Sequence, residues 1–90
     1  MIYSVRITER AKKDLAGLPR NVAKEIYEDI KSLSEEKNPK KYVKKLKGNK
    51  EPPFYSLRVG NYRVIMNILD NVMIIHVIEI GHRKKIYRNF

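Results

Sequence analysis

The last third of the chain alternates between apolar and polar residues, and this alternation constrains the fold more than any other feature of the sequence. Three such runs cover residues 54–59, 62–69 and 72–80, and the dipeptides Gly60-Asn61 and Asp70-Asn71 separate them. Both dipeptides are typical of two-residue β-hairpin turns. The segment therefore predicts three antiparallel strands in succession, a meander with an apolar face that the rest of the chain must cover.

The first third of the chain predicts a strand followed by two helices. Residues 1–8 alternate in the same way and indicate the strand. Thr8 is placed to cap a first helix, which has a narrow apolar stripe and ends before Pro19. A second amphipathic helix is predicted from Pro19 or Arg20 to Ser34. The break between the helices is short, so we expect an antiparallel helical hairpin whose apolar side packs on the sheet.

The composition limits the classes of protein to which the chain can belong. Its 90 residues predict one α+β domain over residues 1–90, and the absence of cysteine excludes disulfides and thiolate metal sites. Two histidines without a carboxylate cluster give no metal-site spacing, and no nucleotide-binding loop is present, so no cofactor is expected. Neither a signal peptide nor a membrane span is visible, which predicts a cytoplasmic protein without a membrane partner.

The charge balance is strongly positive, at +10, with 20 Lys and Arg against 10 Asp and Glu. A field of this sign attracts polyanions, and nucleic acid is the leading class of partner, with an acidic protein second. Lysines concentrate in residues 34–53, a stretch that also holds three prolines. This stretch is either a solvated connector or a surface for a nucleic-acid backbone, and the two interpretations are compatible.

The first hairpin turn fixes which side chains share a face of the meander. With Gly60-Asn61 as the turn, Arg58 lies opposite Arg63 on one face. The other face, which we expect to pack on the helices, carries Tyr55, Leu57, Val59, Tyr62, Val64 and Met66. Opposed like charges destabilise a sheet unless an anion sits between them, although long arginine side chains can also splay into water. We interpret the pair as an anion site.

The second turn places the C-terminal residues relative to Arg63. With Asp70-Asn71 as a two-residue turn, Arg63 pairs with Ile78, and Ile80 follows on the same face. This register predicts that Arg83 lies close to the end of the sheet from which Arg63 emerges.

Four short motifs, in the same order along the chain, resemble the RelE branch of the RelE/ParE toxin superfamily. They are Thr8–Leu15, Lys45–Gly48, Leu57–Arg63 and Gly81–Tyr87. The resemblance implies the strand, helical hairpin and meander predicted above, followed by a short C-terminal helix. It also implies a toxin of a type II toxin–antitoxin pair that cuts mRNA in the ribosomal A site, and a RelB-like acidic antitoxin that wraps the toxin.

The resemblance also assigns roles to particular residues. Arg63 and Arg83 match phosphate-binding arginines of the family, and Tyr87 matches a C-terminal catalytic tyrosine. The sequence departs from the family at Phe54 and Ser56, which stand where lysines take part in catalysis. The residues that we expect to bind RNA are Lys44, Lys45, Lys47, Lys50, Arg58, His82, Lys84 and Lys85.

These residues are suited to RNA cleavage without a metal ion. The 2′-hydroxyl attacks phosphorus, and arginines stabilise the added negative charge with two-pronged hydrogen bonds. Tyr87 is a general base if nearby cations stabilise its phenolate, and otherwise a packing residue. His82 is an acid, a phosphate contact or only a polar residue past a strand end. The alternatives at the level of function are a ParE-like DNA gyrase inhibitor without nuclease activity and a non-enzymatic basic RNA-binding protein.

Overall fold

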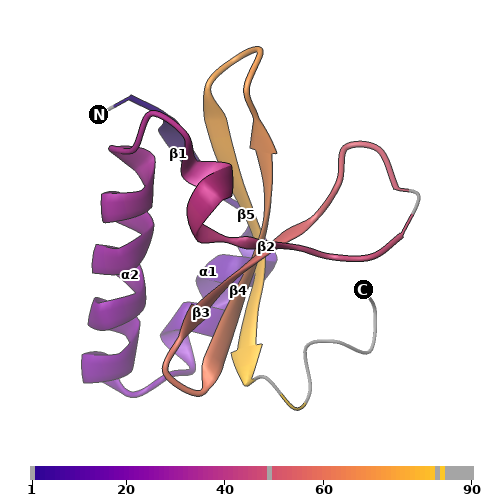
Figure 1. Ribbon diagram of the computed structural model, residues 1–90. Coiled ribbons are helices and arrows are strands. Elements are labelled where there is room, and N and C mark those ends of the chain that lie inside the picture. Colours follow the sequence, from indigo (N-terminus) through magenta and orange to yellow (C-terminus); the bar gives the residue numbers. More distant parts are fainter. Residues whose placement is uncertain (1, 49, 83, 85–90) are drawn as a thin grey trace.

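The structure, a computed structural model, describes residues 2–48, 50–82 and Lys84. Figure 1 shows a twisted sheet with one long helix along one face, while the segment that joins the second and third strands extends from the other side. The elements are β1 (Ser4–Ile7), α1 (Glu9–Ala16), α2 (Arg20–Ser34), the 3₁₀ helix η1 (Pro39–Tyr42), β2 (Lys44–Lys45), β3 (Tyr55–Val59), β4 (Tyr62–Leu69) and β5 (Ile74–His82). This is the α+β architecture that the sequence predicts.

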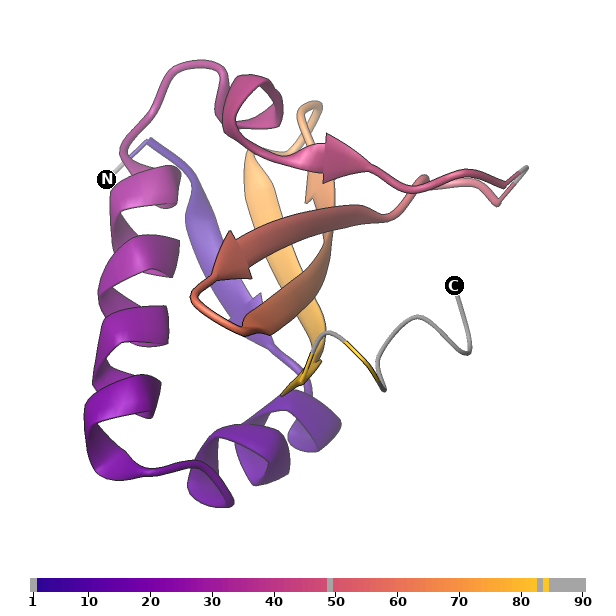
Figure 2. The ribbon, with the colours of Figure 1, turned by 60° about the horizontal axis from the view of Figure 1, so that its bottom comes forward.

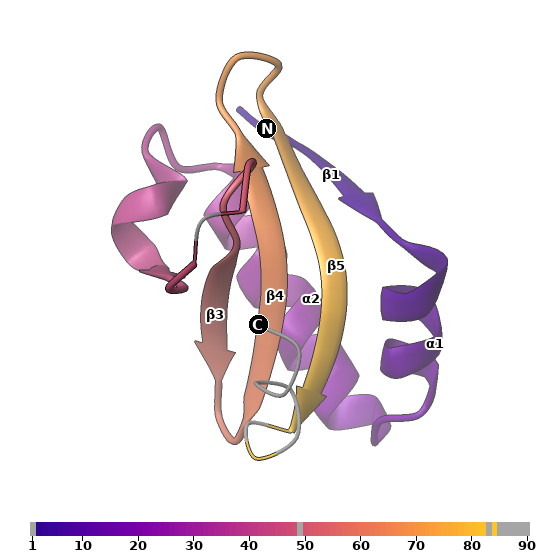
Figure 3. The same cartoon turned by 90° about the vertical axis from the view of Figure 1, so that its right-hand side faces the viewer.

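The five strands form one sheet in the order β1-β5-β4-β3-β2. The predicted meander of β3, β4 and β5 is antiparallel and forms the middle of the sheet (Figure 3). The N-terminal strand β1 joins it in parallel beside β5. At the opposite edge, the two-residue strand β2 pairs with β3. The sequence did not predict β2, because two lysines carry no apolar alternation.

Both helices lie where the sequence predicts them. The Thr8 hydroxyl accepts a hydrogen bond from the Ala11 backbone N–H at 3.1 Å, which confirms the predicted cap of α1. The second helix, α2, begins at Arg20 and ends at Ser34. The two helices follow each other directly, but α1 lies across one end of α2 rather than alongside it (Figure 2). As a result, α1 packs against β5, whereas α2 packs against β1 and β3.

The apolar core lies between α2 and the sheet. The face of the meander predicted to pack on the helices does so, since Tyr55, Val59, Val64 and Met66 are buried there, with Leu57 and Tyr62 packed at its margin. From α2, Ile26, Ile30 and Leu33 complete this core. The opposite face of the meander, which we call the open face, therefore carries the remaining side chains of β3 and β4.

The first hairpin turn forms as predicted. Val59 pairs with Tyr62 and Arg58 with Arg63, so Gly60-Asn61 is a two-residue turn. Gly60 has a φ of 59°, the positive value that a type II′ turn requires at its first central residue. Glycine adopts this conformation without the steric cost that a Cβ would add.

The prediction for the second turn is wrong. Leu69 pairs with Ile74, so the loop contains four residues, 70–73, and β5 begins two residues later than expected. The loop is wound into a helical turn, with hydrogen bonds from Val72 N to the Leu69 carbonyl at 3.3 Å and from Met73 N to the Asp70 carbonyl at 3.2 Å. The Asp70 side chain is held by Tyr3 and Lys40, an arrangement that a turn dipeptide does not reveal.

A β-bulge in β5 shifts the register once more. Met66 pairs with Val77 but Ile65 pairs with Glu79, so Ile78 is an extra residue. The Thr8 hydroxyl donates to the Ile78 carbonyl at 2.8 Å and holds the bulge in place. The predicted pairing of Arg63 with Ile78 is therefore wrong.

Arg63 instead pairs with Gly81. Ile80 pairs with Val64 and is buried on the core side, not on the face of Arg63. The residue that shares the open face with Ile65 is Glu79.

The lysine-rich stretch after α2 is tied to the sheet at several points. It forms η1 and β2, and the Leu46 N–H donates to the Phe54 carbonyl at 2.9 Å. The Asn67 side-chain amide donates to the Pro53 carbonyl at 2.9 Å, which holds the return of the stretch near β4. The predicted C-terminal helix lies outside the described residues. No helix in the part of the chain that is described has the length and apolar character needed to cross a membrane.

Candidate anion-binding site

Cationic side chains from three neighbouring strands share the open face of the sheet. In the pairing of β2 with β3, Lys44 lies opposite Ser56, and in the pairing of β3 with β4, Arg58 lies opposite Arg63. Directly paired residues point to the same face, and residues two apart on one strand do so as well. Lys44, Ser56, Arg58 and Arg63 therefore project from the same side, as the first-hairpin register predicts for the two arginines.

These residues line a concavity of about 500 Å³. Its lining consists of Lys41, Tyr42, Val43, Lys44, Ser56, Arg58 and Arg63. Four of the seven carry a positive charge and none is acidic, so the field inside the concavity favours an anion. The residues come from η1, β2, β3 and β4 and from the connection between them, which are held together by the sheet.

The two arginines differ in their surroundings. Arg63 is half-buried, whereas Arg58 is exposed and donates from Nε to the Gly60 carbonyl at 3.3 Å. Their Cβ atoms, as those of a directly opposed pair, are about 5 Å apart, and like charges in this position destabilise a sheet by up to roughly 1 kcal/mol. A bound anion would remove that cost, because a guanidinium donates two parallel hydrogen bonds to oxygen atoms of a phosphate.

Ser56 lies between Lys44 and the arginines. It is only 4% exposed, and within the described part of the chain its hydroxyl oxygen has no hydrogen-bond partner. A buried hydroxyl without a partner costs free energy that a hydrogen bond would recover.

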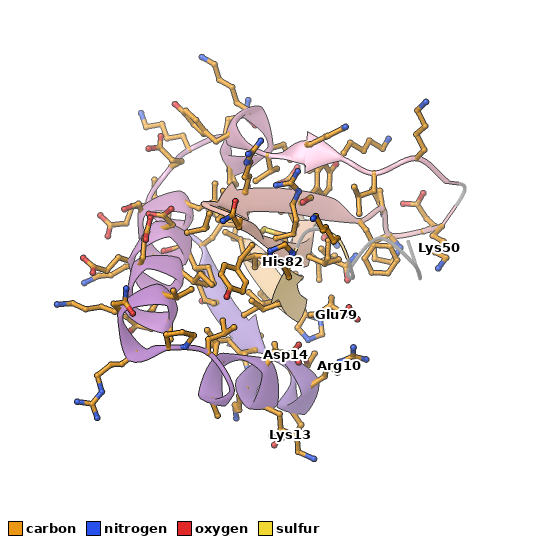
Figure 4. All side chains as sticks on the ribbon, turned by 90° about the horizontal axis from the view of Figure 1, so that it is seen from below. Arg10, Lys13, Asp14, Lys50, Glu79 and His82 are labelled. Carbon is orange, nitrogen blue, oxygen red and sulfur yellow. The ribbon has the colours of Figure 1, made fainter. Side chains whose placement is uncertain are left out.

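The end of β5 nearest to Arg63 is fixed by α1. The Asp14 carboxylate accepts a hydrogen bond from the Ile80 N–H at 3.0 Å, and Arg10 Nη2 lies 3.3 Å from Glu79 Oε1. Figure 4 shows Arg10, Asp14 and Glu79 grouped where the helix meets the strand, with Lys13 pointing away. Since β1 pairs with β5 only as far as Val77, these contacts replace a neighbouring strand for the rest of β5.

His82 lies at this fixed strand end, opposite Tyr62. The two rings meet edge to face with centroids 5.7 Å apart. The His82 Nδ1 accepts a hydrogen bond from the Lys84 N–H at 3.3 Å. His82 is therefore oriented by two contacts, and its role in RNA binding stays a prediction.

A network of polar side chains holds η1, and with it Lys41, against the sheet. Asp70 accepts a hydrogen bond from the Tyr3 hydroxyl at 2.7 Å and pairs with Lys40 Nζ at 2.8 Å. The hydrogen bond with Lys40, followed by that with Tyr3, lowers the pKa of Asp70. The hydrogen bond with Asp70 raises the pKa of both Tyr3 and Lys40. Lys40 also lies over the Tyr55 ring, 5.7 Å from its centroid.

The other predicted site residues are distributed as follows. Lys45 pairs with Tyr55 and so projects to the face opposite Lys44. Lys47 and Lys50 are exposed beyond β2, and Lys50 Nζ lies 5.5 Å from the centroid of the Phe54 ring. Lys84 is exposed as well. Arg83, Lys85 and Tyr87 lie outside the described residues.

Sequence reasoning missed part of the lining. Lys41, Tyr42 and Val43 were not predicted as site residues, although Lys41 belongs to the lysine-rich stretch. The signal that places them is the pairing of β2 with β3, which brings the connector beside Ser56 and Arg58. A pairing of two residues leaves no detectable period in a sequence.

The fold and the site together define a small basic α+β domain with a cationic concavity on the face of the sheet opposite helix α2. The profile of a family described as the ParE toxin of the type II toxin–antitoxin system, parDE, matches residues 5–87. The chain therefore belongs to the RelE/ParE family of toxins of type II toxin–antitoxin systems.

Individual relatives agree with this assignment. A protein of Methanocaldococcus jannaschii named "Putative toxin RelE1" is 35% identical over 91 residues, which cover 99% of both chains. The archaeal RelE–RelB complex from Pyrococcus horikoshii OT3 contains a chain with a TM-score of 0.78 and 30% identity, with coverage of 94% of this chain and 99% of that one. The RelBE2 complex of Mycobacterium tuberculosis gives a TM-score of 0.76 at 30% identity, with 92% and 93% coverage. The predicted resemblance to the RelE branch is confirmed.

Proposed function

We propose that this RelE-type toxin is a ribosome-dependent endoribonuclease that cleaves mRNA in the A site and so inhibits translation in the cytoplasm. The observation that carries the proposal is the concavity lined by Lys41, Lys44, Arg58 and Arg63 without an acidic residue. Such a lining suits a phosphodiester, and its position on a rigid sheet suits the precise placement that catalysis needs.

The proposed reaction needs no metal ion or cofactor. The ribose 2′-oxygen forms a bond to the adjacent phosphorus, the bond from phosphorus to the 5′-oxygen breaks, and a cyclic phosphate remains. The 2′-hydroxyl gives up a proton and the leaving oxygen gains one. Arg63 is the natural stabiliser of the pentavalent phosphorus, because it is half-buried and belongs to β4 at the centre of the meander.

Arg83 and Tyr87 are assigned as the other catalytic residues by the family resemblance. Support comes from the strand register, since Gly81, which pairs with Arg63, lies only two positions before Arg83 in the sequence. In this proposal Arg83 binds phosphate and Tyr87 is the general base, with its phenolate stabilised by neighbouring cations. Because this set is sparse, the ribosome contributes much of the rate by holding the message in an attack-ready geometry.

The proposed partner is an acidic antitoxin. The relatives from P. horikoshii and M. tuberculosis were solved as complexes of RelE with RelB. A net charge of +10 favours a partner of opposite charge, which would associate rapidly and cover the cationic face. Occupation of the concavity by such a partner would exclude RNA.

Primer extension on a translated message tests the nuclease. The wild-type protein is expected to produce breaks at A-site codons on ribosomes and few on the same RNA when it is free. Arg63→Ala should lower the single-turnover rate by about 100-fold, the typical effect of removing one donor to a transition-state oxyanion. Arg20→Ala, an equal charge loss on exposed α2, is the matched control and should change the rate less than twofold. Translation arrest without breaks would refute the nuclease proposal.

A ParE-like gyrase inhibitor is the second candidate, because the matching family profile carries the ParE description. This function predicts toxicity with intact message and trapped gyrase–DNA complexes. A supercoiling assay with purified gyrase, run beside the primer extension, separates the two. Inhibition of supercoiling by both the wild type and Arg63→Ala would favour the inhibitor.

A further inference from the structure

Lys44 and Lys45 are adjacent in the sequence, and both are expected to bind RNA, but their side chains project from opposite faces of the sheet. Lys44 pairs with Ser56 and Lys45 pairs with Tyr55 across the β2–β3 ladder. Ser56 belongs to the open face and lines the concavity, whereas Tyr55 belongs to the apolar core. Because side chains alternate along a strand, Lys44 projects toward the concavity and Lys45 to the opposite side of the sheet.

The position of Lys44 complements that of the arginines. The strand β3 contributes Ser56 and Arg58 to the open face, and β4 contributes Arg63, so the cations of these two strands gather at the hairpin end. Lys44, on β2, approaches from the other flank of Ser56. Two strand spacings separate β2 from β4, roughly 10 Å. A phosphate group above Ser56 would therefore lie within reach of a lysine on one side and an arginine on the other.

We propose that Lys44 is a substrate-contacting residue of the RNA-cleaving site. Its ammonium binds the non-bridging oxygens of the ribonucleotide phosphate held by Arg63, on the side of the phosphate that the arginines leave open. Lys44 acts as a point charge that neutralises negative charge as it grows on phosphorus, and it transfers no proton. This inference rests on the proposed nuclease function. It narrows the expectation that Lys44 binds RNA to a contact with the reacting phosphate, made from a strand that the sequence did not predict.

Ser56 completes the argument for this subsite. Its hydroxyl is a donor, and the side chains that surround it in the concavity are cationic or apolar apart from Tyr42. An anionic oxygen drawn in by Lys44 would supply the missing acceptor and remove the cost of a buried hydroxyl without a partner.

The central experiment compares Lys44→Ala with Lys45→Ala. Both changes remove one positive charge from neighbouring exposed positions, but from opposite faces of the sheet. In single-turnover primer extension, Lys44→Ala is expected to reduce the cleavage rate by about tenfold to hundredfold. Lys45→Ala is expected to cost less than Lys44→Ala. Lys24→Ala on α2, outside the predicted RNA-binding set, is expected to change the rate about twofold at most, the effect of lowering the general field. Equal losses for Lys44→Ala and Lys45→Ala, or no loss for Lys44→Ala, would overturn the proposal.

A binding measurement distinguishes failure of this inference from failure of the nuclease proposal. Fluorescence anisotropy with a short oligoribonucleotide, uncleavable because it is 2′-O-methylated, reports the subsite without any reaction. If the wild type never cleaves but Lys44→Ala binds the oligonucleotide more weakly than Lys45→Ala, the nuclease fails and the anion contact of Lys44 survives. If the wild type cleaves and the two variants bind and cleave alike, the nuclease survives and the role of Lys44 is refuted.

Discussion

Asp70 provides the most demanding test of how the polar network stabilises this fold. Its carboxylate accepts a hydrogen bond from Tyr3, which is only 5% exposed, and pairs with Lys40. Through these contacts it joins β1, η1 and the loop between β4 and β5. Replacing Asp70 by Ala removes both interactions and leaves the Tyr3 hydroxyl without its acceptor.

The expected loss follows from the two contacts. A hydrogen bond to a charged group contributes about 1.5–3 kcal/mol, and we take the lower value because the Asp70 side chain is 53% exposed and water screens it. The pair with Lys40, which is 37% exposed, adds about 0.5 kcal/mol. Asp70→Ala should therefore lower the free energy of unfolding by about 2 kcal/mol, which corresponds to a Tm lower by about 8–16 °C for a domain of this size. Asp70→Asn keeps a neutral acceptor for Tyr3 and should lose about 1 kcal/mol.

The dependence on pH checks the origin of this stabilisation. The pKa of Asp70 is lowered in the folded protein, first by Lys40 and then by Tyr3, so the unfolded state binds a proton more readily. The contribution is complete above the unfolded pKa of about 3.9 and is lost as the pH falls through the lower folded value. The difference between wild type and Asp70→Asn should therefore shrink below about pH 4.

Thermal melts and urea titrations followed by circular dichroism measure these quantities at pH 7 and at several acidic pH values. Glu28→Gln on α2 removes an equal charge from an exposed position and serves as the control. An Asp70→Ala protein that melts at the wild-type temperature at pH 7 would refute the reasoning. So would a difference between wild type and Asp70→Asn that persists unchanged in acid.

Three further perturbations test the turns and the charged pair. Thr8→Ala removes both the cap of α1 and the hydrogen bond to the bulged Ile78 carbonyl, and should cost about 1–2 kcal/mol in urea unfolding, while Thr8→Ser stays near wild type. In Gly60→Ala the added Cβ meets open space, but the alanine must adopt a positive φ, so we expect the free energy of unfolding to fall by about 1–2 kcal/mol. A neutral effect would contradict the turn assignment. Arg58→Gln relieves the repulsion with Arg63 and should raise stability by up to about 0.5 kcal/mol. The same change should weaken RNA binding and lower the slope of the logarithm of the binding constant against the logarithm of the salt concentration by roughly one. A loss of stability in the Arg58→Gln protein would count against an anion site.

The sequence predicts the fold best where a side-chain period is long or a turn is chemically defined. The period of two over the meander and the helical spacing up to Ser34 place those elements within two residues of their observed bounds. Gly60-Asn61 fixes the first register correctly, because a two-residue turn needs a positive φ that glycine supplies. The opposition of Arg58 and Arg63 follows from that turn alone.

The errors arise where distant contacts determine the local structure. Asp70-Asn71 resembles a two-residue turn, but the side chain of Asp70 binds Tyr3 and Lys40, and the loop extends to four residues. The bulge at Ile78 depends on the Thr8 hydroxyl, 70 positions earlier in the chain. The strand β2 exists through its pairing with β3, and without it Lys41 and Lys44 could not be assigned to the concavity. The pattern of residues along a segment does not indicate contacts with distant parts of the chain.

The strand β2 is short and consists of two lysines, and this affects how copies of the protein meet in solution. An edge strand exposes backbone N–H and C=O groups that can pair with the edge strand of another copy, and such pairing leads to aggregation. Here the edge beyond β3 is only Lys44–Lys45, so two copies that approach along it meet like charge against like charge. We therefore expect these two lysines to oppose association of copies along this edge. A variant that neutralises both lysines should therefore lose colloidal solubility together with affinity for RNA.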